Sequence, residues 1–139
     1  MILPRARRAA YRRAFYRADA GTGKAIEIRV GWRSPAVDEL LAARGKRRWV
    51  FLTACNPGAV RLSDAVNRAR TRELESALRT RRITFFRGEG GSDAGDWREE
   101  ESFLALGVSL RAAERLRRRF GQDAFVTGIV GGVARLWPV

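Results

Sequence analysis

Apolar residues recur along the chain with two spacings, one typical of strands and one typical of helices. Short apolar or alternating runs predict strands over residues 14–19, 25–32, 47–55, 83–87, 102–108, 124–130 and 133–139. Helical spacing predicts helices over residues 35–44, 63–79 and 110–120. Each helix follows a serine suited to cap its first turn, namely Ser34, Ser63 or Ser109.

The order of these elements, β-β-α-β-α-β-β-α-β-β, predicts an α+β fold. We expect a single mixed β-sheet of about six or seven strands, packed with about three helices. Residues 1–139 are expected to form a single domain, with residues 1–10 as a candidate mobile basic N-terminal segment. The run 47–55 is apolar almost throughout, which predicts a central strand whose Val50, Leu52 and Ala54 contact a helix.

Composition removes several kinds of chemistry. The chain has no histidine and one cysteine, Cys55, so His-based zinc sites, histidine-activated nucleophiles and internal disulfides are excluded. The acidic residues Glu89, Asp93 and Asp96 match no calcium-loop spacing, so no metal site is assigned and no cofactor is implied. No apolar run approaches the roughly 18 residues of a membrane helix, and no secretory signal is recognised. We therefore expect a cytoplasmic protein with no membrane partner.

The net charge of +13 raises the question of a nucleic-acid partner. The basic residues are 26 Arg and 2 Lys, in separated groups, a skew that a G+C-rich genome tends to produce. Helical spacing puts Arg111, Arg115 and Arg118 on an outer face, and a solvated arginine surface is the favoured interpretation. A nucleic-acid or ribosome-binding surface is the alternative, favoured if these arginines merge with residues 44–48 into one stripe.

Polar residues gather where the central strand passes into the second helix. Asn56 follows the strand, and Ser63, Asn67 and Arg70 share one face of the helix. Ligands favour the carboxyl ends of strands, and a helix N-terminus attracts anions. The alternative is structural: Asn-Pro-Gly makes a turn, Ser63 caps a helix, and Asn67 binds a loop carbonyl.

A second cluster lies in the acidic stretch that precedes the fifth strand. If the strand starts early, Glu100 and Ser102 face one side, and Glu99, Glu101 and Phe103 face the other. Glu100 is the one weak candidate for a catalytic acid or base. Pairing with arginines is the favoured interpretation for Glu99 and Glu101.

Four motifs in the same order make the chain similar to a bacterial family, domain of unknown function 3293. They are TACNP, NRARTREL, W-x-x-E-x-S-F and FGQDAF, and the resemblance runs from about Tyr11 to the final hairpin. It implies a small single-domain bacterial protein without an assigned activity or cofactor. It adds weight to Thr53, Asn56, Pro57, Asn67, Arg70, Trp97, Glu100, Ser102 and Gln122, and it argues against Cys55 as a nucleophile because that position varies in the family.

The sequence therefore predicts a site for a small polar or anionic ligand at the end of the central strand. Its expected residues are Thr53, Asn56, Asn67, Arg70, Glu100, Ser102 and Gln122. Of these, Asn56, Asn67, Arg70 and Glu100 should converge, with Arg70 meeting a negative group. Two alternatives stay open besides: a basic protein that binds nucleic acid, and an enzyme that uses Glu100 without histidine. The alternative role of Gln122 is to brace the turn at Gly121.

Overall fold

The computed structural model describes residues 3–21, 23–95 and 99–138, so Asp96 and Trp97, both named above, lie outside the described residues. The elements, in chain order, are α1 (Arg5–Arg13), β1 (Ala14–Asp19), β2 (Ala25–Ile28), α2 (Pro35–Ala43), β3 (Arg48–Thr53), the 3-10 turn η1 (Pro57–Ala59), α3 (Asp64–Thr80), β4 (Thr84–Ser92), β5 (Glu100–Leu106), α4 (Leu110–Arg119), β6 (Phe125–Ile129) and β7 (Arg135–Trp137).

The predicted α+β fold and the predicted order of elements are confirmed, with one addition. Helix α1 forms in the basic segment for which no helix was predicted, and Leu3 just before it is fully buried. The three predicted serine caps are also present: Ser34, Ser63 and Ser109 each accept a hydrogen bond from the first turn of the helix that follows. Local capping chemistry thus sets where α2, α3 and α4 begin.

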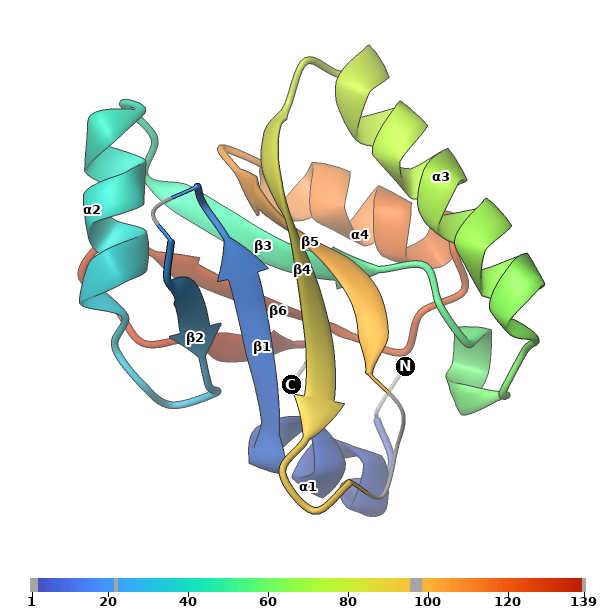
Figure 1. Cartoon of the computed structure of the whole chain (residues 1–139). Helices are drawn as coiled ribbons and strands as arrows, with labels where there is room; N and C mark the ends of the chain where they lie inside the picture. Colours follow the sequence, from blue (N-terminus) through green and yellow to red (C-terminus); the bar gives the residue numbers. More distant parts are fainter. Residues whose placement is uncertain (1–2, 22, 96–98, 139) are drawn as a thin grey trace.

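The seven strands form one curled sheet in the order β2-β1-β4-β5-β3-β6-β7 (Figure 1). All six pairings are antiparallel, whereas the sequence predicted a mixed sheet. The reason lies in the helical crossovers. Helix α3 joins β3 to β4, which run in the same direction, but β5 lies between them, and β3 likewise lies between β5 and β6, which α4 joins. This is the split β-α-β-β-α-β arrangement.

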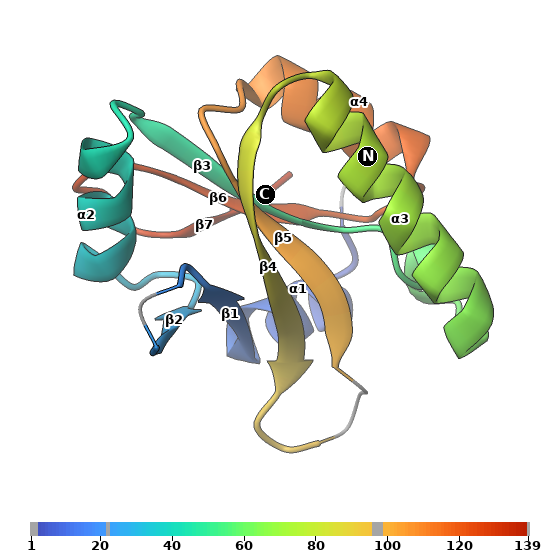
Figure 2. The same ribbon diagram turned by 45° about the horizontal axis from the view of Figure 1, so that its top comes forward.

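The sheet has a hydrophobic core on each face. Helix α2 and the segment before α1 cover one face, over Tyr16, Phe51 and Leu104. Helices α3 and α4 cover the other, as the turned view in Figure 2 shows. This core contains Val50 and Leu52 of β3 and Ala54 just after it, the three residues predicted to contact a helix, and that prediction is confirmed.

Strand β4 is longer than the strand predicted over residues 83–87, because it continues to Ser92. Gly88 explains the difference. A Cβ at that position would lie 2.1 Å from the carbonyl oxygen of Arg17 in β1, so only glycine permits this close backbone approach. The glycines that resemble loop composition in the sequence therefore serve strand pairing here.

No helix in the described part of the chain is long and apolar enough to cross a membrane.

Candidate functional site

A pocket of about 400 Å³ lies at the end of the sheet where β3 ends and β5 begins. Five segments surround it: α1, the β3–α3 connection, the start of α3, the start of β5, and the residues just before β6. Its volume is at the lower end of the range for small-molecule sites. Because β6 runs antiparallel to β3, Gln122 just before β6 lies at the same end as Asn56 just after β3.

Three of the four residues predicted to converge line this pocket: Asn56, Asn67 and Glu100. The two amides are hydrogen-bonded to each other. The backbone N–H of Asn56 donates to Oδ1 of Asn67 at 3.0 Å, and Nδ2 of Asn67 donates to Oδ1 of Asn56 at 2.9 Å. Oδ1 of Asn56 also accepts from the N–H of Leu62 at 2.8 Å, and its Nδ2 donates to Oε2 of Glu100 at 2.7 Å. The amides therefore organise the pocket wall and hold Glu100.

The backbone of Asn56 explains why asparagine stands there. Its φ of 48° and ψ of 61° lie in the left-handed region, which Asn tolerates better than most residues. Gly58 and Ala59 also have positive φ, so the chain reverses tightly after β3. The N–H of Gly58 donates to the carbonyl of Gly121 at 3.0 Å, which ties this turn to the α4–β6 junction.

Arg70, the fourth predicted residue, does not line the pocket. Its Nε donates to the carbonyl oxygen of Ala54 at 2.7 Å, and its terminal nitrogen donates to the carbonyl oxygen of Phe120. The expected contact of Arg70 with a ligand or with Glu100 is thus replaced by a brace between two chain segments. Helical spacing placed Arg70 correctly beside Asn67, but a long side chain reaches past its own helix face.

The other three predicted residues also make internal contacts. Gln122 lines the pocket but donates through Nε2 to the carbonyl of Cys55 at 2.9 Å, and it is buried. The hydroxyls of Thr53 and Ser102 donate to the backbone carbonyls of Glu101 and Glu100. Thr53 and Ser102 line a separate cavity of about 30 Å³, next to the main pocket, that also touches Glu100.

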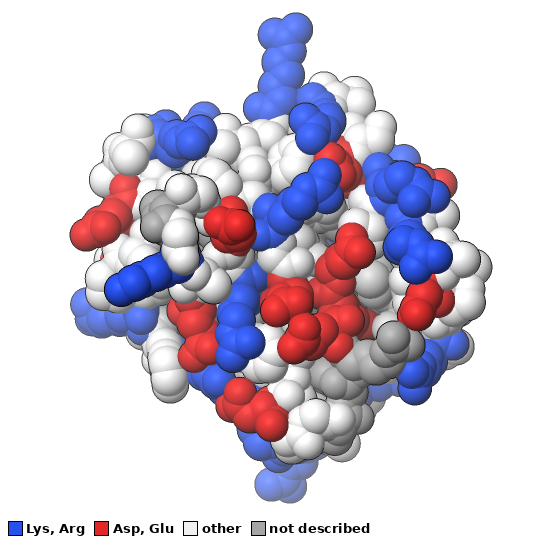
Figure 3. All heavy atoms as spheres, viewed as in Figure 1, with Lys and Arg blue, Asp and Glu red and all other residues white. Residues whose placement is uncertain are grey.

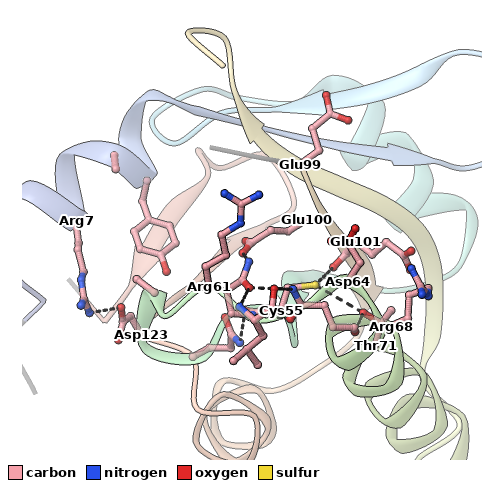
Figure 4. A pocket seen from close by; sticks show the side chains of 17 residues that line it. Arg7, Cys55, Arg61, Asp64, Arg68, Thr71, Glu99, Glu100, Glu101 and Asp123 are labelled. Carbon is pink, nitrogen blue, oxygen red and sulfur yellow. Dashed lines mark hydrogen bonds and ion pairs between the residues drawn. The ribbon is translucent and has the colours of Figure 1, made fainter. Parts of the chain in front are cut away.

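Glu100 is the titratable group placed at the centre of the pocket. Figure 4 shows it and Arg61 between the Arg7–Asp123 pair on one side and Arg68 on the other. Burial raises the pKa of Glu100 above its ordinary value, and the hydrogen bond from Asn56 opposes that shift. Among the hydrogen bonds and ion pairs of the described residues, Asn56 provides the one contact to its carboxylate. A carboxylate accepts several hydrogen bonds, so Glu100 has acceptor capacity left.

Sequence reasoning missed several charged residues and one tyrosine that line the pocket. Its walls contain three arginines and five acidic residues, although the chain as a whole is strongly basic: Arg7, Arg61, Arg68, Asp64, Glu99, Glu100, Glu101 and Asp123. Arg7 is paired with Asp123 at 2.5 Å. Tyr11 comes from α1, where burial raises its pKa strongly. In the sequence, the only sign that the N-terminal segment packs against the pocket was Tyr11, an aromatic residue among many arginines.

The acidic residues considered for a metal have other neighbours. Asp93 forms an ion pair with Arg29 at 2.8 Å, which lowers the pKa of Asp93. A hydrogen bond with Glu99 raises the pKa of Glu89. Across residues 3–21, 23–95 and 99–138 no cluster of three or more Cys, Asp or Glu side chains is suited to hold a metal ion.

Cys55 lines the pocket but is buried, with its Sγ 3.7 Å from Oγ1 of Thr71. Burial raises the pKa of the thiol, so little thiolate forms near neutral pH. We expect a thiol reagent to label the folded protein at pH 7.5 far more slowly than the urea-unfolded chain. Labelling followed by mass spectrometry measures both rates. Equal rates would show a reactive, accessible thiol and would contradict this prediction.

Comparison with known families finds one match, to the family described as "Protein of unknown function (DUF3293)", over residues 52–125. Comparison with curated proteins and with solved structures finds no match. The matched residues run from β3 to the first residue of β6, and so include the β3–α3 turn, Asn67 and Glu100, but not α1. Since the match spans more than half of the chain and agrees with the four motifs, the chain belongs to the DUF3293 family.

Proposed function

We propose that the chain binds a small zwitterionic molecule, of which free amino acids are examples, in the pocket beneath α1. The observation that carries the proposal is the half-buried Glu100 carboxylate, fixed by Asn56 at 2.7 Å and with acceptor capacity left in a pocket of about 400 Å³. A ligand ammonium or N–H group would complete its hydrogen bonds and offset the burial of its charge.

The arginines in the pocket walls support a negative group at the other end of the ligand. Arg7 is already paired with Asp123, whereas Arg61 and Arg68 are exposed and belong to no ion pair among the described residues. A carboxylate or phosphate on the ligand could pair with either guanidinium. Because acidic residues outnumber arginines in the walls, a ligand with both signs of charge fits better than a simple anion.

The test is a thermal-melt screen of the full chain against amino acids, sugar phosphates and nucleotides. A ligand at 100 times its dissociation constant should stabilise the protein by about 2.7 kcal/mol. We expect the response among the amino acids. In Glu100→Gln the response should disappear, while Glu73→Gln, the same change at an exposed residue of α3 outside the pocket, should leave it intact.

The pH dependence of the variant provides a second readout. Since the folded-state pKa of Glu100 is raised, its protonation stabilises the folded protein at low pH, and that contribution is lost as pH rises through the folded pKa. Glu100→Gln should remove this decline and should be at least as stable as the wild type at pH 7. A response that survives in Glu100→Gln, or no response to any amino acid, would refute the proposal.

A second candidate function is acid–base catalysis by Glu100. The observation that favours it is the raised pKa of Glu100 in a pocket beside Asn56, with no arginine paired to Glu100 among the described residues. Incubating the protein with each ligand found in the screen, followed by NMR of the small molecule, distinguishes turnover from binding. Conversion that is absent with Glu100→Gln would favour catalysis, and unchanged ligand would favour binding alone.

A further inference from the structure

We infer that the end of the sheet opposite the pocket binds the phosphate backbone of a nucleic-acid duplex. Three connections meet there: α2–β3, α3–β4 and β5–α4, which Figure 2 shows along one margin of the molecule. Together they carry seven basic residues, which we call the basic end: Arg44, Lys46, Arg47, Arg48, Arg81, Arg82 and Arg111. All except Arg48 are exposed.

Backbone pairing places these connections side by side. Thr84, two residues after Arg82, pairs with Leu106, and Leu106 pairs with Trp49, next to Arg48. The N–H of Gly107 donates to the carbonyl of Arg48 at 2.7 Å. Since neighbouring strands lie about 4.8 Å apart, the ends of β4 and β3, on either side of β5, lie within roughly 10 Å of each other at this end of the sheet.

Lys46 is held across this end by packing. Its aliphatic stem lies over Gly107, where a Cβ would be 2.9 Å from Cδ of Lys46. The stem thus carries residue 46 of the α2–β3 connection onto the β5–α4 connection. Arg111 lies in the first turn of α4, four residues after Gly107.

The basic end lacks internal neutralisation. Of the ion pairs between described residues, none includes any of its seven members. The segments 44–48, 79–84 and 106–111 contain no Asp or Glu. By contrast Arg79, two residues before Arg81, and Arg87 and Arg118, further along β4 and α4, are each paired with a glutamate. In the view of Figure 3, basic side chains lie along the upper margin of the molecule and along its other margins as well, and many of the acidic ones gather near the centre.

Helix capping explains part of this cluster but not all of it. Arg44 and Arg81 occupy the C-cap positions of α2 and α3, where a cation is favoured by the helix dipole. Five members have no such role. Like charges held close together repel one another, so their shared position costs stability unless an anion lies nearby. A polyanion is the partner that this arrangement fits.

The side chains favour a duplex over a single strand. Single-strand sites combine cations with exposed aromatic platforms. The segments 44–48, 79–84 and 106–111 contain no aromatic residue, and the half-buried ring of Phe86 next to them is covered by Arg44, with Cζ 5.4 Å from the ring centroid. Duplex backbones are bound by cations alone, without base stacking. The expected binding is therefore independent of base sequence and steeply dependent on salt.

The experiment measures fluorescence anisotropy of a short labelled duplex with the full chain between about 50 and 200 mM salt. The test variant replaces Lys46, Arg47 and Arg111 with alanine. The control variant replaces Arg12, Arg13 and Arg72, three exposed arginines on α1 and α3, and loses the same charge. We expect the test variant to bind at least about ten-fold more weakly near 100 mM salt, with a salt slope shallower by about 2–3.

The two variants distinguish binding through the basic end from binding that depends only on the net charge of the protein. Unchanged melting temperatures verify that both variants fold, because all six side chains are exposed. Equal losses in the two variants would show that binding follows net charge, and would overturn the inference. Tighter binding of the single strand, or binding of anionic lipid vesicles without binding of the duplex, would also overturn it. The pocket proposal is untouched by these results, since no residue of the basic end lines the pocket.

Discussion

Replacing Arg70 with alanine is expected to lower the free energy of unfolding by about 3–4 kcal/mol, the largest single effect we predict. The guanidinium donates to the carbonyls of Ala54 and Phe120, which lie in residues that are 1% and 3% exposed. Without it the Ala54 carbonyl loses its charged donor, and the Phe120 carbonyl keeps the longer hydrogen bond from Nε2 of Gln122 at 3.3 Å. A hydrogen bond from a charged group contributes about 1.5–3 kcal/mol, and an unsatisfied buried group costs about 1–3 kcal/mol. Urea unfolding monitored by circular dichroism measures the loss.

Arg72→Ala is the matched control for that change. Arg72 lies on the same helix and is exposed, so its loss should alter stability by no more than about 0.5 kcal/mol. Arg70→Lys should recover only part of the stability, because an ammonium cannot reproduce the geometry of the guanidinium fork. If Arg70→Ala were stable but lost its response to ligand, Arg70 would be a ligand contact, as the sequence first predicted.

Replacing Asn56 with alanine is expected to cost about 3 kcal/mol, for two separable reasons. The side chain makes hydrogen bonds with Leu62, Asn67 and Glu100, and their loss leaves part-buried groups without partners. In addition, alanine at a φ of 48° bears a backbone strain of about 1 kcal/mol. Thermal and urea unfolding of the variant should both show the decrease.

Asn56→Gly separates the two contributions. Glycine adopts positive φ without strain, so this variant should be about 1 kcal/mol more stable than Asn56→Ala while lacking the same hydrogen bonds. Ser76→Ala, at an exposed position of α3, serves as the neutral control. Equal stability of the alanine and glycine variants would contradict the assigned strain. A cost well below 1 kcal/mol in both would contradict the assigned hydrogen-bond network.

Alternation and capping predicted much of the fold because both act between residues close in sequence. The period of two in β5 correctly puts Leu104 in one core and Phe103 in the other. The apolar run of β3 correctly predicts a strand internal to the sheet. The last two predicted strands, over residues 124–130 and 133–139, are confirmed as β6 and β7, which pair antiparallel with each other.

These local rules did not predict the order of the strands in the sheet or the presence of helix α1. A helical crossover fixes that two strands run in the same direction, but not whether a third strand inserts between them, so the mixed sheet was predicted in place of the antiparallel one. Helix α1 is rich in arginine and contributes no buried residue of its own. Its position depends on contacts with distant residues, such as Arg7 with Asp123.

For the site, the sequence by itself determined which residues lie at the end of β3 and which share one face of the first turns of α3. It placed Asn56 and Asn67 near each other because strand ends, caps and helical spacing are set by near neighbours. Glu100 lies beside Asn56 because β5 pairs with β3. Only the tertiary structure decided which side chains face the pocket. Arg70 is long enough to reach Ala54 and Phe120, and burial is what raises the pKa of Glu100. The direction and the burial of a side chain depend on contacts with segments far away in sequence. The local pattern of hydrophobic and polar residues does not specify those contacts.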